Sequence, residues 1–319
     1  GSAAPPPTTP EADFAPGELL IEFEPGVSAQ SATQALSTYD AARVRALYKS
    51  EVELWRVPKG EELALAKQLS ALSNVAYAEP NYIVRALDTV PNDPSYSSQW
   101  AHSVMNSAQG WDVTTGTSAV TIAVLDSGID ETHPDLASKI VSGYDFIDTD
   151  ANPHDSNGHG THVAGIAAAV TDNNTGIAGT SWGASIMPIR VLNASGGGTA
   201  AQMIDGINWA VSNGADIINL SLGGTSYSSS AQTTVNNAHA AGVLVIAAMG
   251  NCRVTNSACD VANPTTYPAA YNNVMAVAAT GPSDVYASYS QYGSHCDIAA
   301  PGGDMSFYQD PDGIYSAMP

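Results

Sequence analysis

Two stretches decide the fold that this sequence predicts: Val120–Gly128, Val-Thr-Ile-Ala-Val-Leu-Asp-Ser-Gly, and Asn157–Gly165, Asn-Gly-His-Gly-Thr-His-Val-Ala-Gly. The first is a continuous apolar run that ends in Asp126, which is typical of a buried strand in a parallel sheet. The second predicts a helix that begins at His159. In such sheets functional groups gather where strands end and helices begin. A carboxylate and an imidazole in these places can form a pair in which the carboxylate orients a histidine that acts as general base.

Apolar strands and helices alternate along most of the chain around these two stretches. Continuous apolar strands separated by helices predict an α/β fold with a mostly parallel sheet flanked by helices. We expect strands at 120–126, 185–192, 217–220, 243–247 and 274–278, and helices at 159–170, 200–213 and 230–241.

The first part of the chain has a different pattern. Residues 1–16 are rich in Pro, Ala and Thr and predict a disordered lead-in. Residues 17–88 then predict the order β-α-β-β-α-β of a ferredoxin-like α+β domain, and 88–100 an exposed linker before a domain at 89–319. The expected strands are 19–23, 43–48, 52–57 and 75–84, the last interrupted at Pro80, and the expected helices are 31–38 and 61–72.

Composition and charge limit the classes of protein. A chain of 319 residues with 44% hydrophobic content can form a packed core, and no apolar run reaches the roughly 18 residues of a membrane span. Seven of the 10 Lys and Arg residues lie in residues 1–88, so the later part is strongly acidic and disfavours nucleic acid as a partner. A soluble secreted protein with acidic loops explains this charge most simply; metal binding and adaptation to salt are alternatives.

Four sequence blocks in a fixed order closely resemble the subtilisin-like serine proteases, the subtilases, and the resemblance extends from Pro91 to Pro319. It implies a subtilisin-like catalytic domain. The blocks are Asp126-Ser-Gly-Ile with the nearby His133-Pro-Asp-Leu136, His159-Gly-Thr-His-Val-Ala-Gly165, Asp216-Ile-Ile-Asn-Leu-Ser-Leu-Gly-Gly224, and Ala247-Ala-Met-Gly-Asn251.

The resemblance implies a serine endopeptidase that cleaves protein or peptide substrates. Asp126 would orient His159, His159 would act as general base, and Asn251 would donate to the oxyanion. His162 is interpreted as structural. The substrate backbone would bind between two strand edges and the oxyanion turn, where glycines permit close approach. These substrate-binding residues are Gly196, Gly197, Gly198, Ser221, Leu222, Gly223, Ala248, Met249 and Gly250.

The nucleophilic serine of the family stands in Gly-Thr-Ser-Met-Ala at a helix start. Gly-Thr-Ser occurs here at Ser118, Ser181 and Ser226, and none is followed by Met-Ala. We therefore expect the nucleophile beyond Pro319 and expect this chain alone to be inactive. The alternative is a catalytically inactive, protease-like binding module. A metal-dependent hydrolase is a weaker alternative, because the region around His159 lacks the HExxH motif.

The segment Tyr77-Ala-Glu-Pro-Asn-Tyr82 resembles the inhibitory propeptides of the same family. Together with its position before the subtilisin-like domain, it implies that residues 17–88 are a propeptide. This propeptide would assist folding and then occupy the cleft as an intramolecular inhibitor. The chain is thus expected to be a proform, or zymogen.

Calcium is the cofactor that the resemblance implies, because this hard cation is bound by carboxylate, amide and carbonyl oxygens in loops. The matching ligands are the side chains of Gln99, Asp135 and Asn173 with the carbonyls of Thr175 and Ile177. A second acidic group precedes His159; we interpret it as a solvated loop, with a further metal site as the alternative. Its members are Asp145, Asp148, Asp150 and Asp155.

Three cysteines are present, and Cys252 and Cys259 flank one polar loop. A local disulfide between them is expected in an exported protein and would leave Cys296 unpaired; an odd count also fits a further cysteine beyond the chain. Gly1 and Ser2 resemble a cloning remnant on a chain whose secretion signal has been removed. The location must therefore be inferred indirectly, and the resemblance to the subtilases implies a secreted, extracellular protein.

Overall fold

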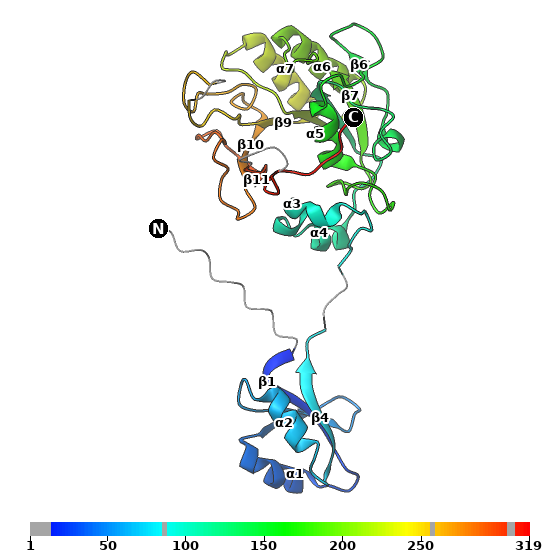
Figure 1. Cartoon of the computed structure of the whole chain (residues 1–319), viewed down its shortest axis with the longest axis vertical. Coiled ribbons are helices and arrows are strands. Elements are labelled where there is room, and N and C mark those ends of the chain that lie inside the picture. The colour runs from blue at the N-terminus through cyan, green and yellow to red at the C-terminus, as the bar shows by residue number, and fades with distance from the viewer. Residues whose placement is uncertain (1–13, 85–87, 256–258, 305–309) are drawn as a thin grey trace. The chain divides into compact units, whose positions relative to one another are not determined.

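The computed structural model describes residues 14–84, 88–255, 259–304 and 310–319. The chain divides into two compact units, Gly1–Leu87 and Asp88–Pro319. Figure 1 labels the helices and strands of each unit.

The first unit is an antiparallel four-stranded sheet with strand order β2-β3-β1-β4 and two helices. Its chain order, β-α-β-β-α-β, is the ferredoxin-like arrangement that the sequence predicts. Helix α1 begins where the Ser28 hydroxyl accepts a hydrogen bond from the backbone N–H of Ser31 at 3.1 Å. The elements are β1 (Phe14–Phe23), α1 (Ala29–Leu36), β2 (Ala42–Ala46), β3 (Val52–Arg56), α2 (Glu62–Leu69) and β4 (Val75–Tyr82), and the side chains of Leu19, Ile21, Leu36, Trp55 and Leu69 form its fully buried centre.

Two expectations for the first unit need correction. Residues 1–13 of the expected lead-in lie outside the described residues, but Phe14 already begins β1, so 14–16 belong to a strand. Strand β4 is not interrupted at Pro80, which pairs with Leu19 of β1. Because β4 is an edge strand, the missing N–H of a proline can be tolerated there.

The second unit contains a seven-stranded sheet of order β11-β10-β9-β8-β5-β7-β6, in which each neighbouring pair is parallel. This confirms the predicted α/β fold with a parallel sheet. The strands are β5 (Thr121–Asp126), β6 (Tyr144–Asp145), β7 (Ser185–Arg190), β8 (Ile217–Leu220), β9 (Leu244–Ala248), β10 (Val274–Thr280) and β11 (Ile298–Pro301), and the helices are α3 (Trp100–Val104), α4 (Ser107–Val113), α5 (His159–Ala168), α6 (Ala200–Ser212) and α7 (Ser229–Ala240).

Helices cover both faces of this sheet. Alternate residues of each central strand point to opposite faces, so the apolar side chains on each face pack against helices. Leu125 of β5 packs into one core cluster with Ile207 of α6 and Val235 of α7. The neighbouring residue Val124 packs into another cluster with Ala164 of α5. Figure 1 shows α6 and α7 side by side, in agreement with their direct contact. Strand β5 thereby packs into two separate cores, one of which also contains α5.

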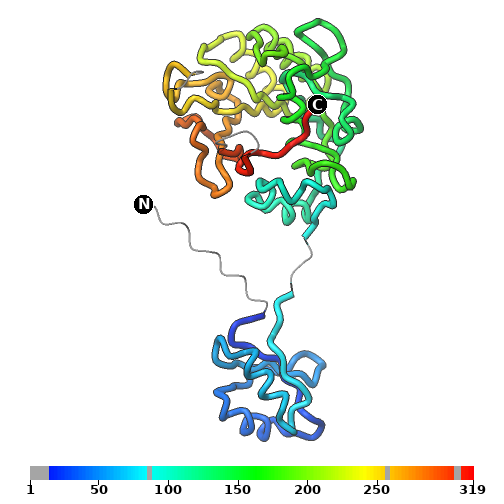
Figure 2. Tube along the Cα trace, in the orientation of Figure 1, coloured from blue at the N-terminus to red at the C-terminus, as the bar shows by residue number. Residues whose placement is uncertain are grey.

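The segment expected as an exposed linker is partly buried. Its residues Pro91, Asp93 and Gln99 are buried within the second unit, and it leads directly into α3 and α4, which the sequence pattern did not predict. The short strands β6 and β11 were also not predicted. Figure 2 shows the last residues running back towards α5, where Ser316 donates a hydrogen bond to the carbonyl of His162 at 2.6 Å. Among the described residues, no helix has both the length and the apolar character needed to cross a bilayer.

Candidate active site

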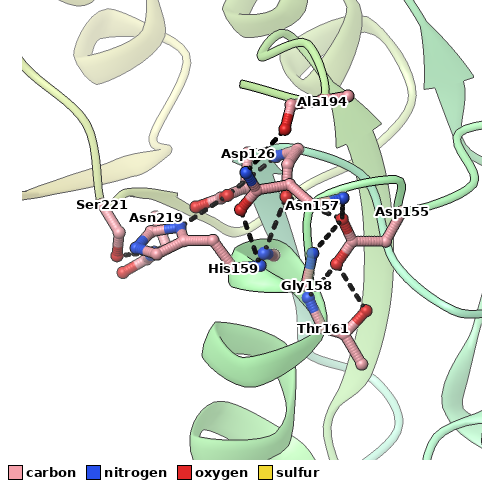
Figure 3. Close-up of polar contacts among 11 residues, drawn as sticks. Asp126, Asp155, Asn157, Gly158, His159, Thr161, Ala194, Asn219 and Ser221 are labelled. Carbon is pink, nitrogen blue, oxygen red and sulfur yellow. Dashed lines mark hydrogen bonds and ion pairs between the residues drawn. The ribbon is translucent and has the colours of Figure 1, made fainter. Parts of the chain in front are cut away.

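Asp126 and His159, which are far apart in the sequence, meet at the carboxyl end of the sheet (Figure 3). Asp126 is the last residue of β5, and His159 is the first residue of α5. Nδ1 of His159 lies 2.7 Å from Oδ1 of Asp126, which also accepts a hydrogen bond from the backbone N–H of Ser127 at 2.7 Å. Because Asp126 is an acceptor, Nδ1 carries the proton and Nε2 keeps a free lone pair.

The two partners differ in their exposure to solvent. The side chain of Asp126 is fully buried, whereas that of His159 is 50% exposed. The hydrogen bond from His159 to Asp126 raises the pKa of the imidazole above its ordinary value, while burial opposes this change. Within the described part of the chain, Oδ2 of Asp126 has no hydrogen-bond partner. The pair is therefore a buried carboxylate that orients an accessible base.

The turn after β9 presents Asn251 to solvent. Gly250 adopts φ +109°, and a Cβ atom there would lie 2.1 Å from Oε1 of Gln291, so both backbone conformation and space require glycine. Asn251 and His159 line the same cavity of about 370 Å³. Ala248, Met249 and Gly250 line it as well, although the Met249 side chain is only 1% exposed and mainly packs in the core.

A second cavity, of about 550 Å³, also includes His159. It lies between the two glycine-containing edges that the sequence predicts as the walls of a substrate groove. Gly198 packs so closely on the Val191 carbonyl that a Cβ atom would lie 2.3 Å from it. The structure thus gathers Gly196, Gly197, Gly198, Ser221, Leu222 and Gly223 around one groove.

No serine of the three Gly-Thr-Ser sequences is bonded to His159 in the described residues. Ser118 lies just before β5, and the backbone N–H of Ser181 is bonded to the Ala167 carbonyl at 3.0 Å. Ser226 lines the larger cavity, and Ser221 accepts a hydrogen bond from the Asn219 amide at 3.0 Å.

His162 bonds the Ile314 carbonyl through Nε2 at 3.1 Å, and burial lowers the pKa of its imidazole.

The proposed metal ligands are only partly brought together. Asp135 is 1% exposed and accepts hydrogen bonds from the Asn173 amide at 3.2 Å and from the Ile177 backbone at 2.9 Å. Gln99 is engaged elsewhere: its amide both donates to and accepts from the backbone of Ala178, each at 2.8 Å. The Gln99 carbonyl oxygen thus has a protein donor, as the Asp135 oxygens do.

A further buried carboxylate, Asp93, contacts the same loop, and the sequence interpretation did not include it. It is 4% exposed, and its two oxygens accept from the backbone N–H groups of Asp172 and Asn173 at 2.9 and 3.2 Å. Asp93 and Asp135 thus both reach the loop that contains Asn173. Among the described residues neither carboxylate has a cationic partner, and neither the Thr175 nor the Ile177 carbonyl accepts a hydrogen bond. The structure describes no group of three or more His, Cys, Asp or Glu residues placed to hold a metal.

The acidic group before His159 is not a solvated loop, so that interpretation was wrong for two of its members. Asp145 is 1% exposed and pairs with Arg190 at 2.7 Å. Asp155 is 4% exposed, and its hydrogen bonds are satisfied around the start of α5. Asp148 is exposed but also pairs with Arg190 at 2.7 Å. These contacts explain the burial of carboxylates without a second metal ion.

Cys252 and Cys259 are joined by a disulfide bond, with their Cα atoms 5.4 Å apart, and Cys296 is free. The bond closes the loop that follows Asn251.

Comparison with known proteins gives two family matches and close relatives. Residues 117–317 match the subtilase family, and residues 2–81 match the fervidolysin N-terminal prodomain. A thermophilic serine proteinase of Bacillus sp. (strain AK1) is 41% identical over 92% of this chain and 71% of its own length. Thermitase of Thermoactinomyces vulgaris is 49% identical over 66% of this chain and 73% of its own length.

The solved structures agree with these matches. A protease from Pseudoalteromonas arctica superimposes with a TM-score of 0.64 at 37% identity, over 72% of this chain and 79% of that one. The family match covers the predicted catalytic blocks, and the prodomain match covers the ferredoxin-like unit up to residue 81. The chain therefore belongs to the subtilase family of serine proteases and carries an N-terminal prodomain.

Proposed function

We propose that this chain is the proform of a secreted endopeptidase in which Asp126 and His159 activate a serine supplied by residues outside the 319-residue sequence. The observation that carries this proposal is the 2.7 Å contact between Nδ1 of His159 and Oδ1 of Asp126 beside two cavities that share His159. A buried carboxylate fixes the tautomer in which Nε2 can accept a proton.

In the proposed reaction, His159 accepts the hydroxyl proton at Nε2 while the serine oxygen forms a bond to the scissile carbonyl carbon. Asp126 stabilises the resulting imidazolium and remains a carboxylate. The amide of Asn251 donates to the oxyanion. His159 then gives its proton to the leaving amine as the C–N bond breaks. Water hydrolyses the acyl-enzyme by the same route, with His159 again as base.

The substrate class we propose is a peptide or protein bound in extended form. The groove of about 550 Å³ lies between the 196–198 and 221–223 segments and extends from His159 to Tyr267 and Tyr271. Exposed backbone at both edges can pair with a substrate strand, and the glycines permit its close approach. Met203, Leu222 and the two tyrosines give the far end of the groove an apolar lining.

The first unit is proposed to assist folding and to inhibit the protease until it is removed. Support comes from its match to a prodomain and from its exposed end, where Tyr82 is 53% and Val84 is 92% exposed. An exposed terminal strand can be extended into a groove that binds extended peptides.

We also propose a calcium site formed by the side chains of Asp93, Asp135 and Asn173 with the carbonyls of Thr175 and Ile177. The fit rests on two buried carboxylates without a described cationic partner and on two carbonyls without a described donor in the same loop. Oxygen ligands of this kind suit Ca²⁺, which would neutralise the buried charge and hold the loop to the segment that contains Asp93.

The disulfide between Cys252 and Cys259 supports secretion, because such bonds persist in oxidising compartments. The alternative, an inactive binding module, receives no support from the relatives, which include proteinases. Sequencing the parent gene beyond Pro319 separates the two: Gly-Thr-Ser-Met-Ala supports the enzyme, and a different residue at the serine position supports the binding module.

A further inference from the structure

We propose that Asp155 is a positioning residue for the protease reaction: it locks the first turn of α5 to the end of β5 and so holds His159 in line with Asp126. This inference rests on the proposed function, because His159 must be the general base for its position to affect catalysis. Asp155 itself does not bond His159.

The carboxylate of Asp155 accepts five hydrogen bonds around the start of α5 (Figure 3). Oδ1 accepts from the Ser127 hydroxyl at 2.8 Å and from the backbone N–H groups of Asn157 at 2.9 Å and Gly158 at 2.8 Å. Oδ2 accepts from the backbone N–H of Thr161 at 2.9 Å and from its hydroxyl at 2.6 Å. The donors lie on both sides of His159 in the sequence, so the histidine backbone is held from both sides.

Ser127 connects this carboxylate to the residue that orients the base. It directly follows Asp126. Its hydroxyl donates a hydrogen bond to Asp155 and accepts one from the backbone N–H of Gly160 at 3.0 Å. The two segments also meet backbone to backbone, because a Cβ atom on Gly160 would lie 2.0 Å from the Gly128 carbonyl oxygen. A change at Asp155 is therefore transmitted to both members of the Asp126 and His159 pair.

The site requires an ionised carboxylate. All five partners donate, and an aspartate can accept from all of them, whereas the amide of an asparagine would place N–H groups against donors. Burial raises the pKa of Asp155, but the hydrogen bonds from Thr161, Gly158 and Asn157 outweigh it and lower the pKa below its ordinary value. A negative charge at the start of a helix is also favoured by the helix dipole.

The charged and titratable groups that face His159 come from each adjoining element. Asp126 faces it from β5, Asp155 from the preceding loop, and His162 from α5 itself. Both carboxylates favour the imidazolium. Loss of the Asp155 charge and loss of the His159 alignment should therefore both lower the pKa of His159.

The first experiment uses Asp155→Asn in the 319-residue chain, with Asp150→Asn as the matched control. Asp150 lies in the same loop and is exposed, and its side chain bonds the backbone of Asn152 at 2.8 Å. NMR with labelled histidine follows the titration of His159 and its Nδ1–H resonance. We expect Asp155→Asn to lower the titration midpoint and to broaden the resonance, while the control leaves both unchanged.

A purely structural role would lower the melting temperature of Asp155→Asn but leave the His159 titration and the Nδ1–H resonance of the folded protein unchanged, and that result would overturn the proposal. If Asp155→Asn does not fold, Ser127→Ala removes only the link between Asp155, Asp126 and Gly160. It should shift the same two signals, and unchanged signals would again contradict the proposal.

A second readout uses the enzyme completed with the segment that carries its nucleophile. We expect Asp155→Asn to lower kcat about 10- to 100-fold with little change in KM, the scale of loss that misplacement of a catalytic group produces. The acidic limb of the pH profile should shift to lower pH. If the completed parent enzyme does not cleave peptides, the proposed function fails, whereas the NMR result still tests the role of Asp155.

Discussion

Oδ1 of Asp126 receives hydrogen bonds from Nδ1 of His159 and from the backbone N–H of Ser127, each at 2.7 Å. The carboxylate is thus fixed by the residue that follows it and in turn fixes an imidazole from another element. The hydrogen bond from His159 raises the pKa of the imidazole above its ordinary value of 6.5. The stability of the folded protein therefore depends on pH through this contact.

We predict that Asp126→Asn reduces stability more in acid than in alkali. A histidine whose folded pKa is raised contributes stability that is fully present below its unfolded pKa and is lost as pH rises through the folded pKa. Thermal melts at about pH 5.5 and about pH 9 measure this. An equal loss at both pH values would contradict the contact with a charged His159.

In the completed enzyme the same substitution should lower kcat by about 10⁴-fold, a typical value for serine proteases.

We predict that Asn251→Ala lowers kcat of the completed enzyme about 10²- to 10³-fold with little change in KM, because an oxyanion donor acts in the transition state. This range is the one known for the oxyanion asparagine of subtilisin, a member of the same family. Steady-state kinetics on a peptide substrate measure the effect. Asn208→Ala, on the exposed face of α6, serves as the control and should leave kcat unchanged. Asn263→Ala is not suitable, because the Asn263 side chain forms hydrogen bonds with Tyr292. A normal kcat in Asn251→Ala would remove this residue from the mechanism.

We predict that calcium raises the thermal stability of this chain through Asp93 and Asp135. A ligand that binds only the folded state adds about 2.7 kcal/mol to the free energy of unfolding at a hundredfold excess over Kd. Melts with calcium and with a chelator should differ for the parent chain but coincide for Asp93→Asn and Asp135→Asn.

Gln99→Met serves as the control for the calcium site. It loses two hydrogen bonds to Ala178, so its melting temperature should fall, but the shift produced by calcium should remain. Loss of that shift in Gln99→Met would instead make Gln99 a ligand and contradict the ligand set that we propose.

We predict that maturation cleaves the chain between Val84 and Asp93. The structure favours the first part of this interval, because Val84 is 92% exposed whereas Pro91 and Asp93 are buried in the second unit. N-terminal sequencing of the mature protein locates the cut. A mature terminus within α2 would rule out residues 17–88 as an intact propeptide, and failure of residues 1–88 to inhibit the mature enzyme would count against its inhibitory role.

The fold and the central pair could be predicted because they depend on local patterns. The apolar run before Asp126 and the small apolar residues after His159 specify a strand and a helix, and the parallel sheet places their ends together. Strand β6 has only two residues and exists because Tyr144 and Asp145 pair with β7, which no periodicity in so short a segment can reveal.

The surroundings of Asp93 and Asp155 could not be read from the sequence, because they depend on the path of the backbone. Asp93 lies 79 residues before Asp172, whose N–H it accepts, and the burial of Asp93 follows from that long-range contact. Asp155 stands in an acidic run that resembles a solvated loop. Its burial becomes visible only when the turn at Gly158, with φ +102°, brings five donors around it.

The most direct test of the central claim measures peptide hydrolysis and fluorophosphonate labelling by this chain and by the same chain completed with its downstream segment. We predict that the 319 residues alone give neither and that completion restores both. His159→Ala and Asp126→Ala should then each greatly reduce hydrolysis. Labelling of the 319-residue chain at Ser118, Ser181 or Ser226, or activity of the completed enzyme that survives both substitutions unchanged, would contradict the assignment of Asp126 and His159 as the pair that activates the serine.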